Sequence, residues 1–382
     1  MKIIIAGDVF AGGDAQNHGL QVISDSWSNA DIRVVNLESP LTDSCIEVEK
    51  CTLYSPPWMV DKIKQIEIDV VSLANNHIHD RGQDGIRDTI EVLKISDIGY
   101  FGAGMNIHQA SEPYWITDEL CMFGYCDFAK PYLCQVAVAN EICAGIAPLR
   151  REFIIADLQE KVPVGKKAIL YFHWGKEHVR LPPSEDITLV KELLAHDKVA
   201  LIVGSHAHRI QGIVKNKNKR AYMCIGNFLF PNFFISPPTR ITYSEQAVNI
   251  NKFYITRLYH SVYALTYKKW KRVNRLSIVL EYDTSTNRVR HIPFLQDDNI
   301  PCVREITGRK RSLIDAIIIL FTMVYALPIS CYNQMAKVNS FIFYKYWSFA
   351  IVCFQLRQLA NEKGIGFVVR KVLSRLSRFV YH

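Results

Sequence analysis

The segment Gly204-Ser205-His206-Ala207-His208 places the strongest constraint on how this chain folds. It follows the apolar run at residues 199–203, which predicts a buried strand. Two imidazoles two residues apart at the end of a strand are held rigidly enough to share a metal ion. An isolated pair of this kind is more often structural than functional, so its meaning depends on where the other strands end.

Other apolar runs also end in side chains able to bind a metal. The runs at 2–6, 31–37, 69–73 and 168–172 lead into Asp8, Glu38, Asn76-His77 and His173. In open α/β sheets, ligands gather beyond the carboxyl ends of the strands. Taken one at a time, these residues also fit turns and caps, but the ordered set favours a shared centre. Mixed nitrogen and oxygen ligands suit Zn, Mn or Fe, and we expect one or two such divalent ions.

Helical patterns separate these strands, at about residues 56–67, 86–93, 150–160 and 187–194. Strands that alternate with helices predict an α/β fold in which helices cover both faces of the sheet. We also expect hairpins at 113–126, 210–225 and 276–295, the second of them around a basic turn from Lys215 to Arg220.

The positive charge of the chain is concentrated at its end. Residues 300–382 contain 12 Lys and Arg against 3 Asp and Glu, whereas the rest contains 33 against 34. A nearly neutral body argues against a nucleic-acid partner. The ten cysteines include no C-x-x-C pair, so free thiols are expected. With no signal peptide after Met1, we expect a cytoplasmic protein, peripheral at the inner face of the membrane if its tail binds lipid.

Six ordered segments give the chain a recognisable pattern. It resembles the CapA family of capsule and poly-γ-glutamate biosynthesis proteins, a branch of the calcineurin-like metallophosphoesterases. The resemblance covers about residues 2–298 and implies an α/β/β/α sandwich. The segments are Gly7-Asp8, Asn36-Leu37-Glu38, Ala74-Asn75-Asn76-His77 with Asp80 and Gly82, His173-Trp174-Gly175 with Glu177, Gly204-Ser205-His206-Ala207-His208, and Gly226-Asn227-Phe228.

The resemblance implies a role for each matching position. Asp8 and His208 would bind one metal ion, and Glu38 would bridge to a second. Asn76, His173 and His206 would bind that second ion, and His77 would be the general acid or would steady the leaving oxygen. The residues expected to support the ligands or to contact the substrate are Asn36, Asn75, Asp80, Glu177 and Asn227.

Two departures from the wider phosphoesterase pattern leave the chemistry open. Phe10 stands where an imidazole ligand is expected, and Glu38 replaces a bridging aspartate. Three kinds of scissile bond therefore remain hypotheses: a phosphoester, an amide and a glycan-linked bond. The resemblance implies a metal-dependent hydrolase in the synthesis of capsule, poly-γ-glutamate or another cell-surface polymer. The alternative is a non-catalytic, membrane-associated subunit of a capsule synthesis or export complex; a metallonuclease is less favoured.

We predict a body at residues 1–298, with an insertion at about 232–275, and an extension at 299–382. The insertion could be a lid, a surface for an anionic glycan or lipid headgroup, or a packed helix, which is the default; its aromatic residues are Tyr254, Tyr259, Tyr263, Tyr267 and Trp270. In the extension, basic residues flank apolar helical stretches, as in an anchor that lies in the membrane interface. Packing of the extension against the body or against a second copy of the chain is an equally good alternative.

Overall fold

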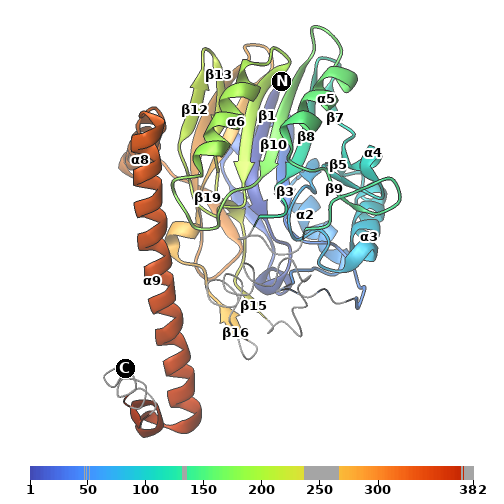
Figure 1. Ribbon diagram of the computed structural model, residues 1–382. Helices are drawn as coiled ribbons and strands as arrows, with labels where there is room; N and C mark the ends of the chain where they lie inside the picture. Colours follow the sequence, from blue (N-terminus) through green and yellow to red (C-terminus); the bar gives the residue numbers. More distant parts are fainter. Residues whose placement is uncertain are drawn as a thin grey trace.

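In the computed structural model, two β-sheets pack face to face (Figure 1). The model describes residues 1–46, 48, 50, 52–130, 136–235, 266–370 and 373. The larger sheet has nine strands in the order β2-β19-β18-β17-β1-β3-β4-β5, with β14 also paired to β1. Their bounds are β1 Lys2–Val9, β2 Gln21–Ile23, β3 Ile32–Leu37, β4 Val70–Ser72, β5 Gly99–Phe101, β14 Asn227–Leu229, β17 Leu276–Asp283, β18 Arg288–Gln296 and β19 Cys302–Glu305.

The second sheet has six strands in the order β12-β13-β11-β10-β8-β7. Its central strands β8, β10 and β11 run parallel to one another, and β10 is paired along its whole length. The bounds are β7 Tyr114–Thr117, β8 Leu120–Cys126, β10 Lys167–His173, β11 Val199–Ser205, β12 Ile213–Asn216 and β13 Lys219–Tyr222.

Alternate residues of the central strands fill two different layers of the core. Ile3 and Ile5 of β1 face the second sheet, where they share one apolar cluster with Tyr171 and Val203. Ile4 faces the other way and belongs to the cluster that includes helices α2 (Val60–Gln65) and α3 (Gly82–Ile95). Because these strands are buried on both faces, they appear in the sequence as unbroken apolar runs.

Helices α5 (Arg151–Lys161) and α6 (Ser184–Ala195) cover the outer face of the second sheet, through Ile154, Leu158 and Val190. The order of layers is therefore helix, sheet, sheet, helix, and the expected α/β/β/α sandwich is confirmed. The shorter elements are α1 Asp25–Ser28, α4 Ile107–Ala110, β6 Ala103–Gly104, β9 Gly145–Ile146 and the 3₁₀ turns Gly13–Gln16, Pro57–Met59 and Arg272–Asn274.

The three expected hairpins form, and one of them is tighter than predicted. β7 with β8, β12 with β13, and β17 with β18 are antiparallel pairs. In the second hairpin Lys215 pairs with Arg220 and Asn216 with Lys219, so the basic residues expected in the turn lie mostly in strands. Lys217 adopts a φ of 52°, which allows the chain to reverse within two residues.

The ends of the insertion form a small two-stranded sheet. β15 (Phe233–Ile235) pairs with β16 (Thr266–Lys268). The prediction of a packed helix is therefore wrong at Tyr267 and Lys268, because β15 supplies a strand partner there. Its other aromatic residues, Tyr254, Tyr259 and Tyr263, lie outside the described residues.

The extension is helical, as expected. Helix α8 (Gly308–Tyr325) lies along the body, and helix α9 (Ile329–Lys363) continues past it (Figure 1). Within the described residues, no helix is both long and apolar enough to cross a membrane. Strand β19, which follows the predicted boundary at residue 298, belongs to the larger sheet, and the division into body and extension stays a prediction.

Candidate metal centre

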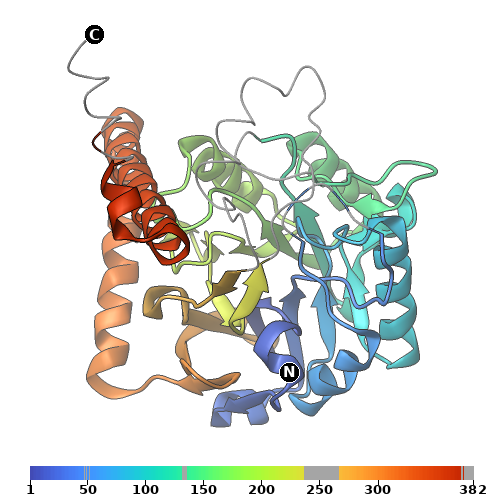
Figure 2. The same ribbon diagram turned by 90° about the horizontal axis from the view of Figure 1, so that it is seen from below.

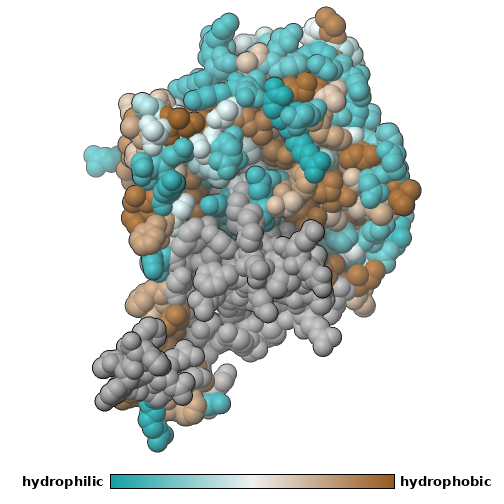
Figure 3. Space-filling model, in the orientation of Figure 1, coloured by the Kyte–Doolittle hydropathy of each residue, from teal (hydrophilic) through white to brown (hydrophobic). Residues whose placement is uncertain are grey.

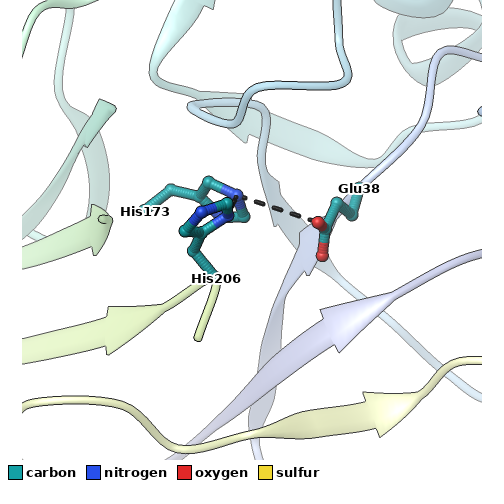
Figure 4. Close-up of side chains that lie close together, drawn as sticks. All are labelled: Glu38, His173 and His206. Atoms are coloured by element: carbon teal, nitrogen blue, oxygen red, sulfur yellow. Dashed lines mark hydrogen bonds and ion pairs between the residues drawn. The ribbon is translucent and has the colours of Figure 1, made fainter. Parts of the chain in front are cut away.

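The carboxyl ends of strands from both sheets meet at one place. In the larger sheet Asp8 of β1 is paired with Asn36 of β3 and with Asn227 of β14. In the second sheet His173 ends β10 beside the end of β11, after which His206 follows. Glu38 from the larger sheet and the two histidines from the smaller one face each other across this junction (Figure 4).

Two glycines allow the backbones to approach closely enough for this arrangement. A Cβ atom at Gly7 would lie 1.8 Å from the carbonyl oxygen of Gly226. At Gly204 it would lie 2.0 Å from the carbonyl oxygen of Met223. Any larger residue would push β1 or β11 away from its neighbouring segment, and the ligands at their ends would move with it.

Glu38 lies at the centre of the site, between the two groups of candidate ligands. Within the described part of the chain, neither of its buried carboxylate oxygens accepts a hydrogen bond. Oε1 lies 3.8 Å from His173 Nε2 and 3.9 Å from His208 Nε2. Burial, followed by the negative charges of Asp8 and Glu177, raises the pKa of Glu38 well above its usual range. A cation between these groups would remove that penalty.

Contacts surround both ring nitrogens of His173. Its Nδ1 lies 3.0 Å from Ser205 Oγ and 3.3 Å from Asn36 Nδ2. Its Nε2 lies 2.8 Å from Asn76 Oδ1 and 3.0 Å from His206 Nδ1. A cation bound at Nε2 would therefore have the Asn76 oxygen and the His206 ring beside it.

His208 is oriented in the same way from its other ring nitrogen. Its Nδ1 donates to Asn227 Oδ1 at 2.6 Å, which leaves Nε2 facing Glu38. A metal-binding histidine normally has such a partner on its second nitrogen. Asp8 lies beside it, with Oδ2 3.6 Å from the same Nδ1 and 3.3 Å from the backbone nitrogen of His206.

The backbone of the H-x-H segment is strained. His206 and His208 have φ values of 82° and 50°, which place both in the left-handed region. Residues other than glycine adopt this conformation at a cost, and such positions concentrate at functional sites. The buried Nε2 of His206 has no hydrogen-bond partner among the described residues. Burial is the main cause that lowers the pKa of His206, to about 4, so the ring is neutral and able to bind a metal.

These side chains form two overlapping groups that share Glu38. One group is Glu38, His173 and His206, and the other is Asp8, Glu38 and His208; in each, the possible ligand atoms lie within 4.8 Å of one another. The oxygens of Glu38 and the Nε2 of His206, which have no hydrogen-bond partner among the described residues, fit a divalent metal ion. The resemblance implies a division of the ligands that places Asn76 with His173 and His206, and this assignment stays a prediction.

Two asparagines connect the site to its supporting strands. Asn36 Nδ2 donates to Asp8 Oδ1 at 2.8 Å. Asn75 Nδ2 in turn donates to Asn36 Oδ1 (3.1 Å) and to the carbonyl oxygen of Leu37 (2.8 Å). Asn36 and Asn75 therefore lie where support of the ligands was expected.

His77 belongs to a separate group beside the metal ligands. Its Nδ1 lies 2.6 Å from Asp80 Oδ2, and the backbone nitrogen of Leu53 donates to the same oxygen at 2.6 Å. Lys50, buried like Asp80, pairs with that carboxylate and with the carbonyl oxygen of Asn76. Burial raises the pKa of Asp80, but the charges of Lys50 and His77 outweigh it and lower the value below the usual range. Lys50 is a site residue that the sequence did not identify.

A small pocket opens on the metal ligands and on His77. Its wall includes Glu38, Glu177 and His208, together with aromatic and basic residues from the insertion; the other lining residues are Thr52, Leu53, His77, Phe230, Phe233, Ile235, Lys268 and Trp270. The ammonium group of Lys268 lies 4.1 Å from the ring centre of Trp270. The insertion thus contributes part of the pocket wall.

Phe10 completes an apolar cluster at this wall. Its ring packs against Phe230 and Phe233, with ring centres 5.3 and 5.4 Å apart. It therefore supplies no metal ligand at the position where the resemblance implied an imidazole. His178, which sequence reasoning missed, is buried between His208 and Trp270 and contacts Asn274 Nδ2 at 2.9 Å. By contrast, His18 and His196 contact none of the proposed ligands in the described structure.

Comparisons with known proteins place the chain in a family. The family model described as bacterial capsule synthesis protein PGA_cap matches residues 2–232. Similar proteins include the capsule biosynthesis protein CapA of Bacillus anthracis, 27% identical over 176 residues, and the PGA biosynthesis protein CapA of Bacillus subtilis (strain 168), 23% identical over 175 residues. Each match covers 45% of this chain, and 42% and 45% of the two relatives. The segment that the family model matches reaches from β1 to beyond β14. The chain therefore belongs to the bacterial capsule synthesis protein family.

Proposed function

We propose that this chain is a metal-dependent hydrolase that acts in the synthesis or processing of a capsule polymer. The observation that carries the proposal is the buried carboxylate of Glu38, which accepts no hydrogen bond from the described residues and lies among His173, His206 and His208. Relatives named for capsule and PGA biosynthesis support a cell-surface polymer, such as poly-γ-glutamate, or its precursor as the substrate.

Asp8, Glu38, His173, His206, His208 and Asn76 would hold one or two divalent ions, with Mn, Zn and Fe the candidates. When bound, such an ion would polarise the scissile bond and acidify a water molecule. Asn227 and Asn36 keep His208 and Asp8 in the orientation that binding needs. The neutral imidazole of His206 requires no proton loss before it binds.

His77 would act as the general acid that protonates the leaving group. Its Nδ1 donates to Asp80, so the opposite nitrogen, Nε2, is the one available to the pocket. Asp80 stays ionised because Lys50 pairs with it, so its carboxylate can hold the N–H group of the His77 ring in place. Lys50 and Asp80 would therefore act through His77, as positioning residues.

The test is hydrolysis by the full chain loaded separately with Mn²⁺, Zn²⁺ or Fe²⁺. Phosphomonoesters, phosphodiesters, γ-glutamyl amides and capsule-type glycans would each be offered as substrates. The proposal expects turnover of one class that His206→Ala abolishes and that the control His196→Ala preserves. Turnover that His206→Ala leaves unchanged would contradict it.

One observation favours a second candidate function. Phe10 fills the place of an imidazole ligand with an aromatic cluster, so fewer nitrogens are available to one of the two groups. A non-catalytic subunit of a capsule synthesis or export complex, with a structural metal, fits that loss. The test replaces the wild-type chain with His77→Ala in the complex. If the complex still assembles and makes as much polymer as before, this function is favoured over hydrolysis.

A further inference from the structure

Helices α8 and α9 attach to the body along one side only. Tyr325 OH accepts a hydrogen bond from the backbone nitrogen of Gly212 (3.0 Å), and Thr322 Oγ1 accepts one from Ile213 (3.0 Å). At the start of α9, Tyr332 OH donates to the carbonyl oxygen of Pro182 (2.5 Å). These contacts fix which faces of the two helices point away from the body.

The faces turned away from the body are apolar. Met323 is 65% exposed and Phe349 is 69% exposed. At 100° per residue, the exposed apolar residues of α8 span a strip roughly 120° wide, opposite the buried Ile314 and Ile318. Apolar residues also appear along the edge of the molecule where the two helices lie (Figure 3). The exposed residues that define this outward face are Leu313, Ile319, Leu320, Met323, Val338, Phe341, Ile342, Phe349 and Val352.

Basic residues lie at the start of α8, two of them in or beside the outward face, whereas Arg311 lies on the side of the helix that faces the body. Arg309, Lys310 and Arg311 lie in the first turn of α8, which has no acidic residue. The helix dipole makes this position unfavourable for positive charge, so the stability of the helix does not explain them. Arg311 has one acidic neighbour, Asp315, at 3.8 Å. Residues 300–382 carry nine more basic than acidic side chains, whereas the rest of the chain is nearly neutral.

We propose that the outward face of α8 and α9 docks on an anionic lipid surface. Apolar side chains would enter the boundary between headgroups and acyl chains, and the basic residues would contact the acidic headgroups. A second copy of the chain is a poorer occupant, because it would bring two strongly positive extensions together. The apolar strip is also wider than the narrow seam that a pair of helices needs.

Docking in this way would place the candidate metal centre close to the lipid. Phe343 of α9 lies 6.3 Å, between ring centres, from His178, which in turn lies 5.6 Å from His208. Lys271, at the end of the insertion, donates to Tyr346 OH at 2.8 Å. Seen from below, α9 stands at one side of the body (Figure 2). The docking surface is independent of the proposed hydrolase activity, since it needs no turnover.

Co-sedimentation of the full chain with lipid vesicles tests the proposal. The probes are vesicles of phosphatidylcholine alone and of phosphatidylcholine with one third phosphatidylglycerol. We expect binding to the anionic vesicles, weakened at least tenfold by Phe341→Gln/Phe349→Gln and also by high salt. The matched control is Ile95→Gln/Val164→Gln, which changes two exposed apolar residues of the body, 87% and 95% exposed.

Three results would overturn the proposal. The first is no binding to either kind of vesicle, and the second is binding that the Phe341→Gln/Phe349→Gln variant retains in full. The third is a wild-type chain that does not bind vesicles but is a dimer in light scattering, while the same variant is a monomer. That result would assign the outward face to a second copy of the chain. Circular dichroism establishes that the variant keeps its helices, since both substituted residues are exposed and glutamine is a good helix former.

Discussion

The carboxylate of Asp80 joins His77 to Lys50. Its Oδ2 lies 2.6 Å from His77 Nδ1, and its other oxygen pairs with the Lys50 ammonium group, all in a buried setting. This link fixes which nitrogen of His77 reaches the pocket. The side chains of this link are not among the proposed metal ligands, so they can be altered without removing a ligand.

Loss of the His77 ring should therefore slow the reaction without releasing the metal. We expect His77→Ala to lower kcat roughly 10²- to 10⁴-fold, the usual worth of a general acid, and Asp80→Asn to give a smaller loss in the same direction. Metal content should stay at the wild-type level in both. His79→Ala is the control, two residues away and outside the pocket wall. Equal losses in His79→Ala would show that the effect is not specific to His77.

Removal of the partner of His208 should weaken metal binding. Asn227 Oδ1 accepts the hydrogen bond from His208 Nδ1, so Asn227→Ala frees the ring to turn. We expect a 10- to 100-fold loss of affinity for the metal, measured by competition with a chelator. Asn216→Ala, in the β12–β13 hairpin, should bind the metal like the wild type. An unchanged affinity in Asn227→Ala would mean that this hydrogen bond does not orient a ligand.

Gly204 should not tolerate a side chain. A Cβ atom there would lie 2.0 Å from the carbonyl oxygen of Met223, between β11 and its neighbour. We expect Gly204→Ala to lower the free energy of unfolding by about 3 kcal/mol or more, measured by urea denaturation. Gly19→Ala is the control, because its Cβ would meet only the Gln65 side chain at 3.6 Å. A stable Gly204→Ala protein with full metal content would contradict the close approach.

The buried carboxyl group of Asp186 should make stability depend on pH. Burial, and then the charge of Asp127, raises the pKa of Asp186 to about 8. Because the pKa is raised in the folded state, the contribution of this group to the free energy of unfolding is greatest below its unfolded pKa of about 4. That contribution is lost as the pH rises from about 4 to about 8. Asp186→Asn should thus gain Tm relative to the wild type at pH 8–9, by roughly 2–6 °C, and gain little near pH 4.

Thermal unfolding monitored between pH 4 and pH 9 would show this trend. Asp118→Asn, an exposed site, provides the control and should follow the wild type at every pH. A difference in Tm between Asp186→Asn and the wild type that does not change with pH would contradict the raised pKa.

The layers of the fold and the residues that converge at the centre could be predicted because they lie at the ends of apolar runs. Asp8, Glu38, His173 and His206 each follow such a run, and parallel strands carry their ends to one edge. Their division into two groups around Glu38 was implied only by the family resemblance.

The remaining site residues had no comparable signal. Lys50 lies in an irregular polar segment, and nothing in its neighbourhood indicates that it reaches Asp80. His178 and Trp270 meet His208 from segments about 30 and 60 residues away along the chain, so their proximity depends on tertiary packing. A packed helix was the default expectation for the insertion, but the partner strand β15 determines the conformation of its described end.

Metal content is the most direct measure of the central claim. Elemental analysis of the full chain, purified without chelator and then equilibrated with Mn²⁺, Zn²⁺ and Fe²⁺ in turn, should find about one or two equivalents of one metal. Glu38→Gln and His206→Ala should lose it, whereas His196→Ala should keep it. A wild-type chain that retains no metal under any of these conditions, or a Glu38→Gln chain that retains as much as the wild type, would contradict a metal centre built around Glu38.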